Sequence, residues 1–262
     1  MIRALYTAAS GMSAQQLNLD TIANNLANSS TTGFRQTRLQ FQDMIYQNLI
    51  TPGAAQSQST VSAGLQIGLG TKSAATEIIN TQGELNETDN PLDVAIEGTG
   101  FFQVQRPDGT IAYTRAGQFH MNNQGTVVTS DGDPVIPTIT IPANATAVTI
   151  TQYGVVNATL AGQQNPSQLG QLQLATFPNP GGLETLGSNL MQATLSSGDA
   201  VLGNPGGTEG MGTLQQGYLE NSNVDVVTEF VQMVLAQRAY ESDSKVIKTA
   251  DDMYSQVNNM TH

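Results

Sequence analysis

The side chains that most often carry out metal or acid–base chemistry are scarce in this chain. Its 262 residues include two histidines and no cysteine. His120 lies in a strand-like segment beside Phe119 and Met121, and His262 is the last residue. Metal sites need several ligands at defined spacing, and the sequence has no such spacing. We therefore expect no metal site, and we interpret the two histidines as a surface side chain and a terminal one.

Carboxylate pairs and glycine-rich loops are the remaining candidates for chemistry. Asp131 and Asp133 are close enough in sequence for acid–base work, but they flank a turn glycine. The glycines of 98–100 and 64–70 are similar to phosphate-binding loops, yet neither stretch falls between a strand and a helix. We interpret the carboxylates as solvated charge and the glycines as turns or bulges. The sequence thus predicts no catalytic residues, no cofactor and no enzyme.

Charge and composition argue against further classes of function. Lys and Arg number nine against 21 Asp and Glu, a net charge of -12, which does not suit a phosphate backbone. No segment approaches the ~20 apolar residues of a membrane-spanning helix. The N-terminus lacks the basic patch and apolar run of a cleaved signal, so any export would leave it intact. We expect neither nucleic-acid binding nor membrane insertion.

The low charge content instead favours contact between identical copies. Only 11% of the residues are charged, against the roughly 25% that is typical of soluble domains. Uncharged polar groups suit repeated subunit contacts, because copies with the same high charge density repel each other.

An amphipathic helix is predicted from Met1 to about Asn28, within an N-terminal segment 1–30 of an inner domain. Apolar residues recur every seven positions along one side. Gly11 costs about 1 kcal/mol relative to Ala. It indicates either a closely approaching neighbour or tolerance of a poor helix former. The predicted packing residues are Leu5, Met12, Leu19, Ile22 and Leu26.

A second amphipathic helix is predicted from Val224 to about Asn258, within a C-terminal segment 224–262 of the same inner domain. It would be about 50 Å long, far beyond the average globular helix. Ser222 precedes Asp225 at the spacing of a capping box, and the acidic group of Asp225 suits a helix start. The predicted packing residues are Val226, Phe230, Met233, Tyr240, Ile247 and Tyr254.

The middle of the chain has the pattern of β structure. In 92–97 and 148–151 apolar residues alternate with polar or small ones, and glycine turns follow at short intervals. We predict an antiparallel β domain over 71–204, an extended connecting segment over 31–70 and a return connection over 205–223. The fold class is therefore α+β, with the two terminal helices paired as a coiled-coil-like inner domain.

The two helices present more apolar surface than they can cover by themselves. One partner helix covers only one side of such a stripe, and ordering a chain end costs conformational entropy. We therefore expect both ends to be largely disordered in a free monomer and to fold when several copies pack together.

Several segments together resemble the bacterial flagellar rod and hook subunits. The similarity lies at 9–12, 23–28 and 32–35, in 217–225 and 237–241 of the tail, and at 96–102 and 113–119 in the β domain. It covers nearly the whole chain. The residues that match the family motifs most closely are Asn24, Asn25, Asn28, Gly33, Phe34, Asn223, Gln237, Arg238 and Tyr240.

Within that family, the length and the 39–70 stretch are most similar to a distal rod subunit, and proximal rod or hook subunits are the alternatives. The resemblance implies export without a cleaved signal through the flagellar type III apparatus. It implies a stiff hollow polymer in the basal body, spanning periplasm to outer membrane, that transmits torque. The implied partners are other copies, proximal rod and hook subunits, the rod cap, and the L- and P-ring proteins.

A secreted module that binds cell-wall glycan is the competing hypothesis from another class. Glycan clefts usually carry exposed aromatic side chains and, for hydrolysis, a carboxylate pair. The chain has no Trp and only 5% aromatic residues, which disfavours this hypothesis.

Overall fold

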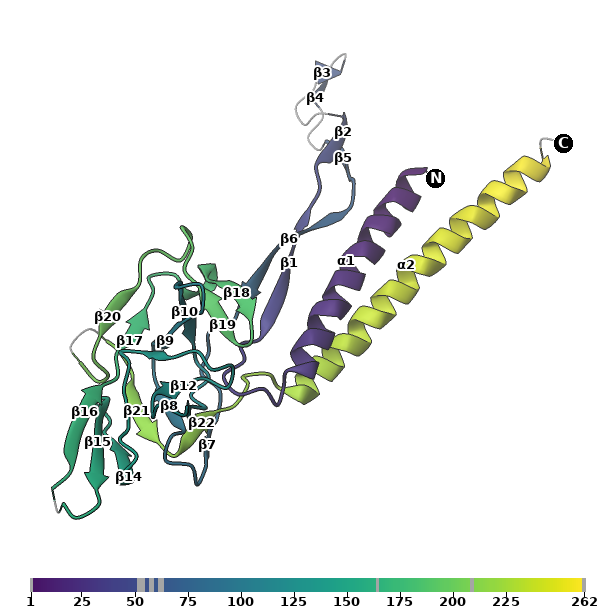
Figure 1. Cartoon of the computed structure of the whole chain (residues 1–262). Helices are drawn as coiled ribbons and strands as arrows, with labels where there is room; N and C mark the ends of the chain where they lie inside the picture. Colours follow the sequence, from purple (N-terminus) through teal and green to yellow (C-terminus); the bar gives the residue numbers. More distant parts are fainter. Residues whose placement is uncertain are drawn as a thin grey trace. The chain divides into compact units, whose positions relative to one another are not determined.

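The computed structural model describes residues 2–50, 55–56, 59–60, 64–163, 165–207 and 210–260. These residues form an α+β fold, with a long helix at each end and antiparallel strand pairs between them (Figure 1), as the sequence predicted. The chain divides into two compact units. The helical unit comprises Met1–Leu26, Thr37–Glu77 and Asp225–His262, and the β unit comprises Ala27–Gln36 and Ile78–Val224. The domain boundaries drawn from the sequence stay predictions.

The helical unit contains α1 (Ile2–Ala27) and α2 (Val226–Met260), which run side by side in opposite directions (Figure 1). The Asn25 amide nitrogen donates to Glu229 Oε2 at 3.3 Å, and a Cβ on Gly11 would lie 2.6 Å from Asp243 Oδ2. Gly11 and Asn25 are 14 residues apart in α1, as are Glu229 and Asp243 in α2. The two contacts therefore share one register. Of the two explanations for Gly11, the structure supports the close neighbour.

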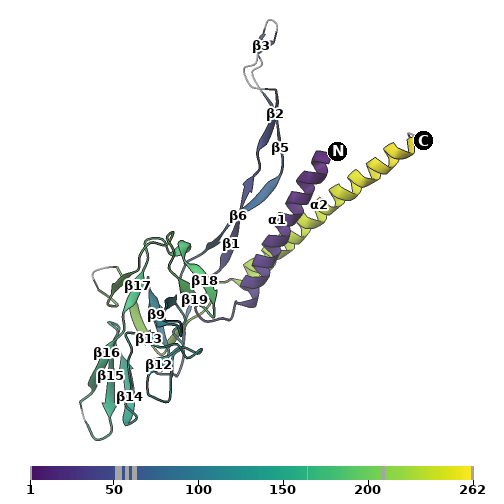
Figure 2. The ribbon, with the colours of Figure 1, turned by 45° about the horizontal axis from the view of Figure 1, so that its top comes forward.

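Paired strands complete the helical unit. β1 (Thr37–Asp43) pairs with β6 (Thr71–Ile78), and β2 (Tyr46–Ile50) pairs with β5 (Leu65–Gly68). Figure 2 shows the β1–β6 ribbon continuing into the β2–β5 ribbon, and β3 (Ala55–Gln56) pairs with β4 (Ser59–Thr60) farther on. The Thr71 N–H donates to Ser10 Oγ at 3.3 Å, which joins the ribbon to α1.

Helix α2 begins at a side-chain cap. The carboxylate of Asp225 accepts from the Val227 N–H at 2.9 Å and from the Thr228 N–H at 3.4 Å. These amides have no partner within the first helical turn, and an aspartate at this position supplies one. The predicted capping box at Ser222 is wrong, because the Ser222 hydroxyl accepts from the Val224 N–H, ahead of the helix, while Asp225 makes the cap.

The β unit is built on a seven-stranded antiparallel sheet. Its path is β18 (Glu184–Gly187), β19 (Leu190–Gln192), β10 (Ile111–Thr114), β9 (Phe101–Gln105), β17 (Leu174–Thr176) and β20 (Val201–Gly203), with β13 (Val135–Ile136) pairing to β9.

The β unit also contains smaller sheets and a 3-10 turn at Pro180–Gly182. They are β14 (Ala145–Ile150), β15 (Val155–Leu160) and β16 (Ser167–Gln171); β8 (Val94–Glu97) with β21 (Thr213–Gln216); β7 (Leu85–Glu87) with β22 (Tyr218–Glu220); and β11 (His120–Met121) with β12 (Val127–Val128).

The core of the β unit forms around two phenylalanines. The rings of Phe102 and Phe119 pack edge to face with centroids 5.0 Å apart, and Ile96 and Leu174 are buried with them. The alternation predicted for 92–97 is only partly right. Residues 93 to 96 are all buried: Val94 and Ile96 belong to the hydrophobic core, and the Asp93 carboxylate accepts hydrogen bonds from the side chains of Thr88 and Asn90. In 148–151 the alternation is present.

The Asp225 cap gives a prediction with a defined pH direction. Hydrogen bonds from the Thr228 hydroxyl and from the Thr228 and Val227 amides hold the pKa of Asp225 below its ordinary value. The cap therefore stabilises α2 fully above the ordinary carboxyl pKa and is lost as the pH falls through the lowered pKa. Circular dichroism at 222 nm should show a larger acid-induced loss of helix in the wild type than in Asp225→Asn, which caps without a charge.

Asp225→Ala serves as the comparison for that experiment, since alanine removes the cap at every pH. It should lower the helix signal already at neutral pH. Identical acid titrations for the wild type and Asp225→Asn would contradict the role of the carboxylate.

Candidate functional site

Large apolar side chains remain exposed along the first half of α2. Val227 is 72% exposed and Leu235 is 58% exposed. The exposed apolar residues of this stretch recur at spacings of three and four, which places them on one side of the helix. We call this set the apolar face of α2: Val226, Val227, Phe230, Val231, Val234 and Leu235.

The opposite side of α2 faces α1 and is less apolar. Ala236 and Ala250 are buried there, seven residues from Glu229 and Asp243, which both contact α1. Small side chains at these positions let the two helices approach closely.

The predicted packing residues of the two helices differ in how deeply they are buried. In α1, Ile22 is buried and the other four are half-buried. A straight helix drifts by about 20° for every seven residues, so a strict seven-residue row winds around it. The row in α2 therefore begins on the exposed side and ends on the α1 side. Val226, Phe230 and Tyr240 are exposed, while Met233, Ile247 and Tyr254 are half-buried.

Asn25 holds the start of the ribbon to α1 within the helical unit. Its side-chain oxygen accepts from the Thr37 N–H at 3.0 Å, and its side-chain nitrogen donates to the Thr37 carbonyl at 2.8 Å. The same amide reaches Glu229 of α2. One buried side chain therefore joins α1, the ribbon and α2.

Asn223 joins separate chain segments within the β unit in the same way. Its side-chain oxygen accepts from the Gln36 N–H at 2.7 Å, and its nitrogen donates to the carbonyls of Ile79 and Thr81 at 2.9 and 3.0 Å. Gln36, Ile79 and Asn223 each lie within two residues of a point where the chain passes between the units. The chain passes between the two units at four points, and the Asn223 side chain lies at one of them and hydrogen-bonds next to two others.

Gly33 fits a position that excludes side chains. Its φ of +72° is in the left-handed region, and a Cβ would lie 2.6 Å from the Ala116 nitrogen. Its N–H donates to the Glu220 carbonyl at 2.7 Å. Phe34 and Asn28 are half-buried, and Asn24, Gln237, Arg238 and Tyr240 are exposed.

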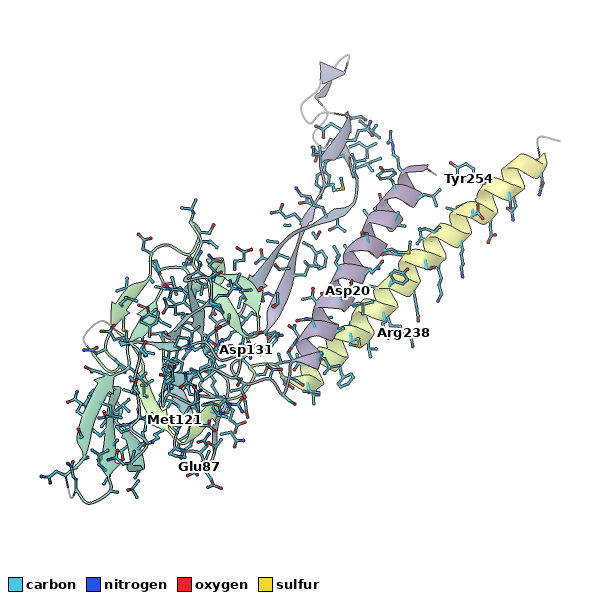
Figure 3. All side chains as sticks on the ribbon, viewed as in Figure 1. Asp20, Glu87, Met121, Asp131, Arg238 and Tyr254 are labelled. Atoms are coloured by element: carbon cyan, nitrogen blue, oxygen red, sulfur yellow. The ribbon has the colours of Figure 1, made fainter. Side chains whose placement is uncertain are left out.

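Arg238 and Tyr254 are both labelled on α2 in Figure 3; Arg238 is exposed, whereas Tyr254 is half-buried. Arg238 lies 3.2 Å from Glu241 in an ion pair whose side chains are more than half exposed. Such a surface pair contributes little to stability.

Three charged side chains meet inside the β unit. Arg35 Nη2 lies 2.8 Å from Glu220 Oε1, and Arg115 Nη1 lies 3.6 Å from Glu220 Oε2. All three side chains are almost completely buried. We call this set the buried ion cluster. Since Arg35 is in the N-terminal segment, Arg115 follows β10 and Glu220 ends β22, the cluster joins three distant parts of the sequence.

Backbone groups support the cluster. The Gly83 N–H donates to Glu220 Oε1 at 2.9 Å, and Arg35 donates to the Thr81 carbonyl at 2.6 Å. The Arg115 guanidinium also lies 5.6 Å from the centre of the Phe101 ring, within cation–π range.

The cluster carries an excess positive charge. Burial lowers the pKa of Arg115 to about 10, with Glu220 opposing this shift and Arg35 adding to it. Arg115 therefore stays protonated at neutral pH. Two guanidinium groups against one carboxylate leave a net charge of +1 in a buried place.

The motif analysis did not single out this cluster. Arg35, Arg115 and Glu220 lie within the matched segments 32–35, 113–119 and 217–225, but they were not chosen as site residues. A usable signal was present, because charged residues are rare in this chain: Arg35 and Arg115 are the sole charged residues of their segments, and Glu220 shares its segment only with Asp225.

The described residues hold few groups suited to catalysis. His120 is exposed, and no group of three or more metal-ligating side chains occurs in this part of the chain. Asp133 is buried, so its interpretation as solvated charge is wrong, whereas Asp131 is exposed. His262 lies outside the described residues. Neither helix is long and apolar enough, over its described length, to cross a membrane.

A cavity of about 620 Å³ lies in the β unit and is lined mainly by polar side chains. Its lining contains serine, threonine and asparagine and no aromatic residue. A glycan site normally offers an aromatic surface to the sugar ring. The cavity therefore gives the competing glycan hypothesis no support.

Three family models match the chain. The flagella basal body rod protein model matches residues 5–35, the flagellar hook protein FlgE/F/G D1 domain matches 95–158, and the flagellar basal body rod FlgEFG protein C-terminal model matches 215–260. Each matched range contains one residue of the buried ion cluster.

Full-length relatives agree with these matches. The flagellar basal-body rod protein FlgG of Buchnera aphidicola is 48% identical over 99% of this chain and 100% of its own length. FlgG of Caulobacter vibrioides is 50% identical over 96% and 97%, and FlgG of Borreliella burgdorferi is 48% identical over 99% of both chains.

Neutralising Glu220 should strongly destabilise the β unit. Glu220→Gln leaves two buried guanidinium groups without their carboxylate, and breaking a buried pair costs about 3–5 kcal/mol. Urea unfolding followed by tyrosine fluorescence should show this loss. Glu184→Gln removes an exposed carboxylate of the same unit and should change the unfolding free energy by less than about 0.5 kcal/mol. Equal, small effects of the two substitutions would contradict the role of the cluster.

Proposed function

The chain belongs to the flagellar basal-body rod protein family and is a structural subunit of the distal rod, and from this premise we propose that it polymerises through the apolar face of α2. The polymer is a stiff hollow helical shaft that transmits motor torque to the hook and conducts exported subunits. The observation that carries the proposal is the row of apolar side chains that α2 leaves exposed while it lies against α1.

The energetics favour covering this face with other copies. Fully burying one large apolar side chain stabilises by roughly 1.5–3 kcal/mol, so burying the exposed half of each contributes on the order of 1 kcal/mol. Val227, Phe230 and Leu235 are each at least 50% exposed. In a polymer, every subunit offers the same face to its neighbours, and these contributions add up along the shaft.

We further propose that α1 and α2 pair as a coiled-coil-like inner domain. The shared 14-residue spacing of their two contacts equals two heptads, the repeat of such a pairing. Gly11 and the buried Ala236 and Ala250 supply the small side chains that a close approach needs.

Torque must pass through the chain segments that connect the two units. Asn25 fixes these segments within the helical unit, and Asn223 together with the buried ion cluster fixes them within the β unit. Side chains anchored in this way resist being pulled out of either unit. This supports a structural role in which the subunit transmits mechanical force.

The surroundings of the subunit follow from the family. We propose that the partners are further copies, proximal rod and hook subunits, the rod cap, the L- and P-ring proteins and the flagellar type III export apparatus. The location is the basal body from periplasm to outer membrane, reached without a cleaved signal. Identity along the full length of FlgG proteins supports the distal rod over the proximal rod or hook alternatives.

Polar substitutions on the apolar face should weaken assembly without lowering the helix propensity of α2. In Val231→Gln/Val234→Gln, two exposed side chains lose their apolar contact while helix propensity rises slightly. Sedimentation velocity should show that the double variant needs at least about tenfold more protein to assemble than the wild type.

The matched control changes two exposed positions of the same helix outside the apolar face, Glu241→Gln/Lys245→Gln. It should assemble as the wild type does. If the valine variant assembles at the wild-type concentration, the apolar face of α2 is not the polymer contact.

A further inference from the structure

The seven-stranded sheet of the β unit has two open edges. Along its path, β18 lies at one end and β20 at the other (Figure 1). Within the described part of the chain, β18 pairs only with β19, and β20 pairs only with β17. Each edge strand therefore has a row of backbone N–H and C=O groups that faces away from the sheet, and a strand of another chain can pair with such a row.

The edge at β20 lacks the usual protection against such pairing. Natural edge strands are protected by charged side chains, by proline or by a covering segment. β20 consists of Val201, Leu202 and Gly203, so it contains neither a charge nor a proline. Val201 is 48% exposed and Leu202 is 49% exposed. β20 thus presents two adjacent apolar side chains beside an open backbone row.

The two edge strands run in opposite directions. The path contains six strands, from β18 through β19, β10, β9 and β17 to β20, and every pairing between neighbours on it is antiparallel. An even number of alternating strands makes the first and the last antiparallel to each other. When two copies lie side by side in the same orientation, β20 of one copy and β18 of the next therefore meet as an antiparallel pair.

The faces of the sheet match across this contact. Residues directly opposite each other on neighbouring strands share a face of the sheet. Leu202 lies opposite Ala175, and Thr185 lies opposite Met191. Ala175 and Met191 belong to one apolar cluster of the β unit. Leu202 and Thr185 therefore lie on the same face, and they can stand opposite each other when two sheets join.

This alignment also brings exposed apolar side chains together. In an antiparallel pair, one step forward along one strand is one step back along the other, so Val201 comes to lie opposite Leu186. Leu186 is 38% exposed, and it has no partner in β19 because the register shifts there. Gly203 comes to lie opposite Glu184, so this carboxylate meets no second charge.

We propose that β20 of one copy pairs with β18 of the next, so that the sheet continues from subunit to subunit. This inference rests on the proposed polymerisation and adds a contact between β units. Because two different edges meet, the contact is heterologous, and such contacts build open helical polymers unless they close a ring. The composition favours this contact, since copies with a net charge of -12 repel each other and the two edge strands together carry a single charge, that of Glu184.

The first test uses the absence of cysteine from the chain. Leu202→Cys/Thr185→Cys places one thiol on each edge, and an antiparallel pair brings opposite Cα atoms within the about 4.4–6.8 Å that a disulfide spans. The reduced full-length variant is assembled, oxidised and separated by non-reducing gel electrophoresis. It should give a ladder of multimers, because each copy becomes linked to two neighbours.

Three variants control this experiment. Val201→Cys/Thr185→Cys places the thiols on opposite faces of the sheet and should give no ladder, since Val201 and Leu202 are adjacent in one strand. The single variants Leu202→Cys and Thr185→Cys should stay monomeric on the gel, because a heterologous contact does not bring two identical positions together. A dimer from either single variant would reveal an isologous contact and would overturn the proposal.

The outcomes separate this inference from the proposed function. If Leu202→Cys/Thr185→Cys assembles but gives no ladder, the paired edges are overturned while polymerisation stands. If the wild type itself does not assemble, the proposed function and the inference both fail.

The second test places a charge on the edge strand. A lysine on an edge opposes pairing, so Val201→Lys should raise the protein concentration needed for assembly by roughly threefold, the scale of one cross-strand pair. Ile111→Lys is the matched control, because Ile111 is similarly exposed, at 44%, but lies in the interior strand β10. It should assemble as the wild type does in sedimentation velocity. Equal assembly of the two lysine variants would contradict a contact through β20.

Discussion

The dominant constraint on this molecule is the apolar surface that its long C-terminal helix cannot cover within one chain. Helix α2 lies against α1 along one side, where buried alanines and a glycine allow close approach. Its other side carries exposed valines, a phenylalanine and a leucine. Burying such side chains is the main driving force for association of proteins. A subunit of this kind is therefore most stable among copies of itself.

Buried polar groups fix the segments that connect the two units of each subunit. The chain passes between the helical unit and the β unit four times. Asn223 of the β unit accepts a hydrogen bond from the Gln36 N–H. Asn25 of the helical unit accepts one from the next amide along the chain, that of Thr37. Arg35 and Glu220 then fix the first and last segments of the β unit to each other.

The sequence predicted the elements well and the buried polar network poorly. Seven-residue apolar repeats identified both helices, because helix period is a local property of the chain. The repeat did not show that the apolar row of α2 winds from the exposed side of the helix to the side that faces α1, because this depends on helix geometry over many turns. The cluster of Arg35, Arg115 and Glu220 joins residues that are far apart in sequence, so only the fold brings them together. The cap at Asp225 was misassigned to Ser222, because the two residues offer similar local signals.

Amide hydrogen exchange of the full-length chain, followed by mass spectrometry, tests the central claim most directly. If copies of the chain complete the packing of the helices, peptides from 2–27 and 226–260 should exchange rapidly in dilute monomer. In assembled protein they should become at least about a hundredfold slower, while peptides from 94–105 stay protected in both states. Strong protection of both helices in the dilute monomer, unchanged by assembly, would contradict the claim.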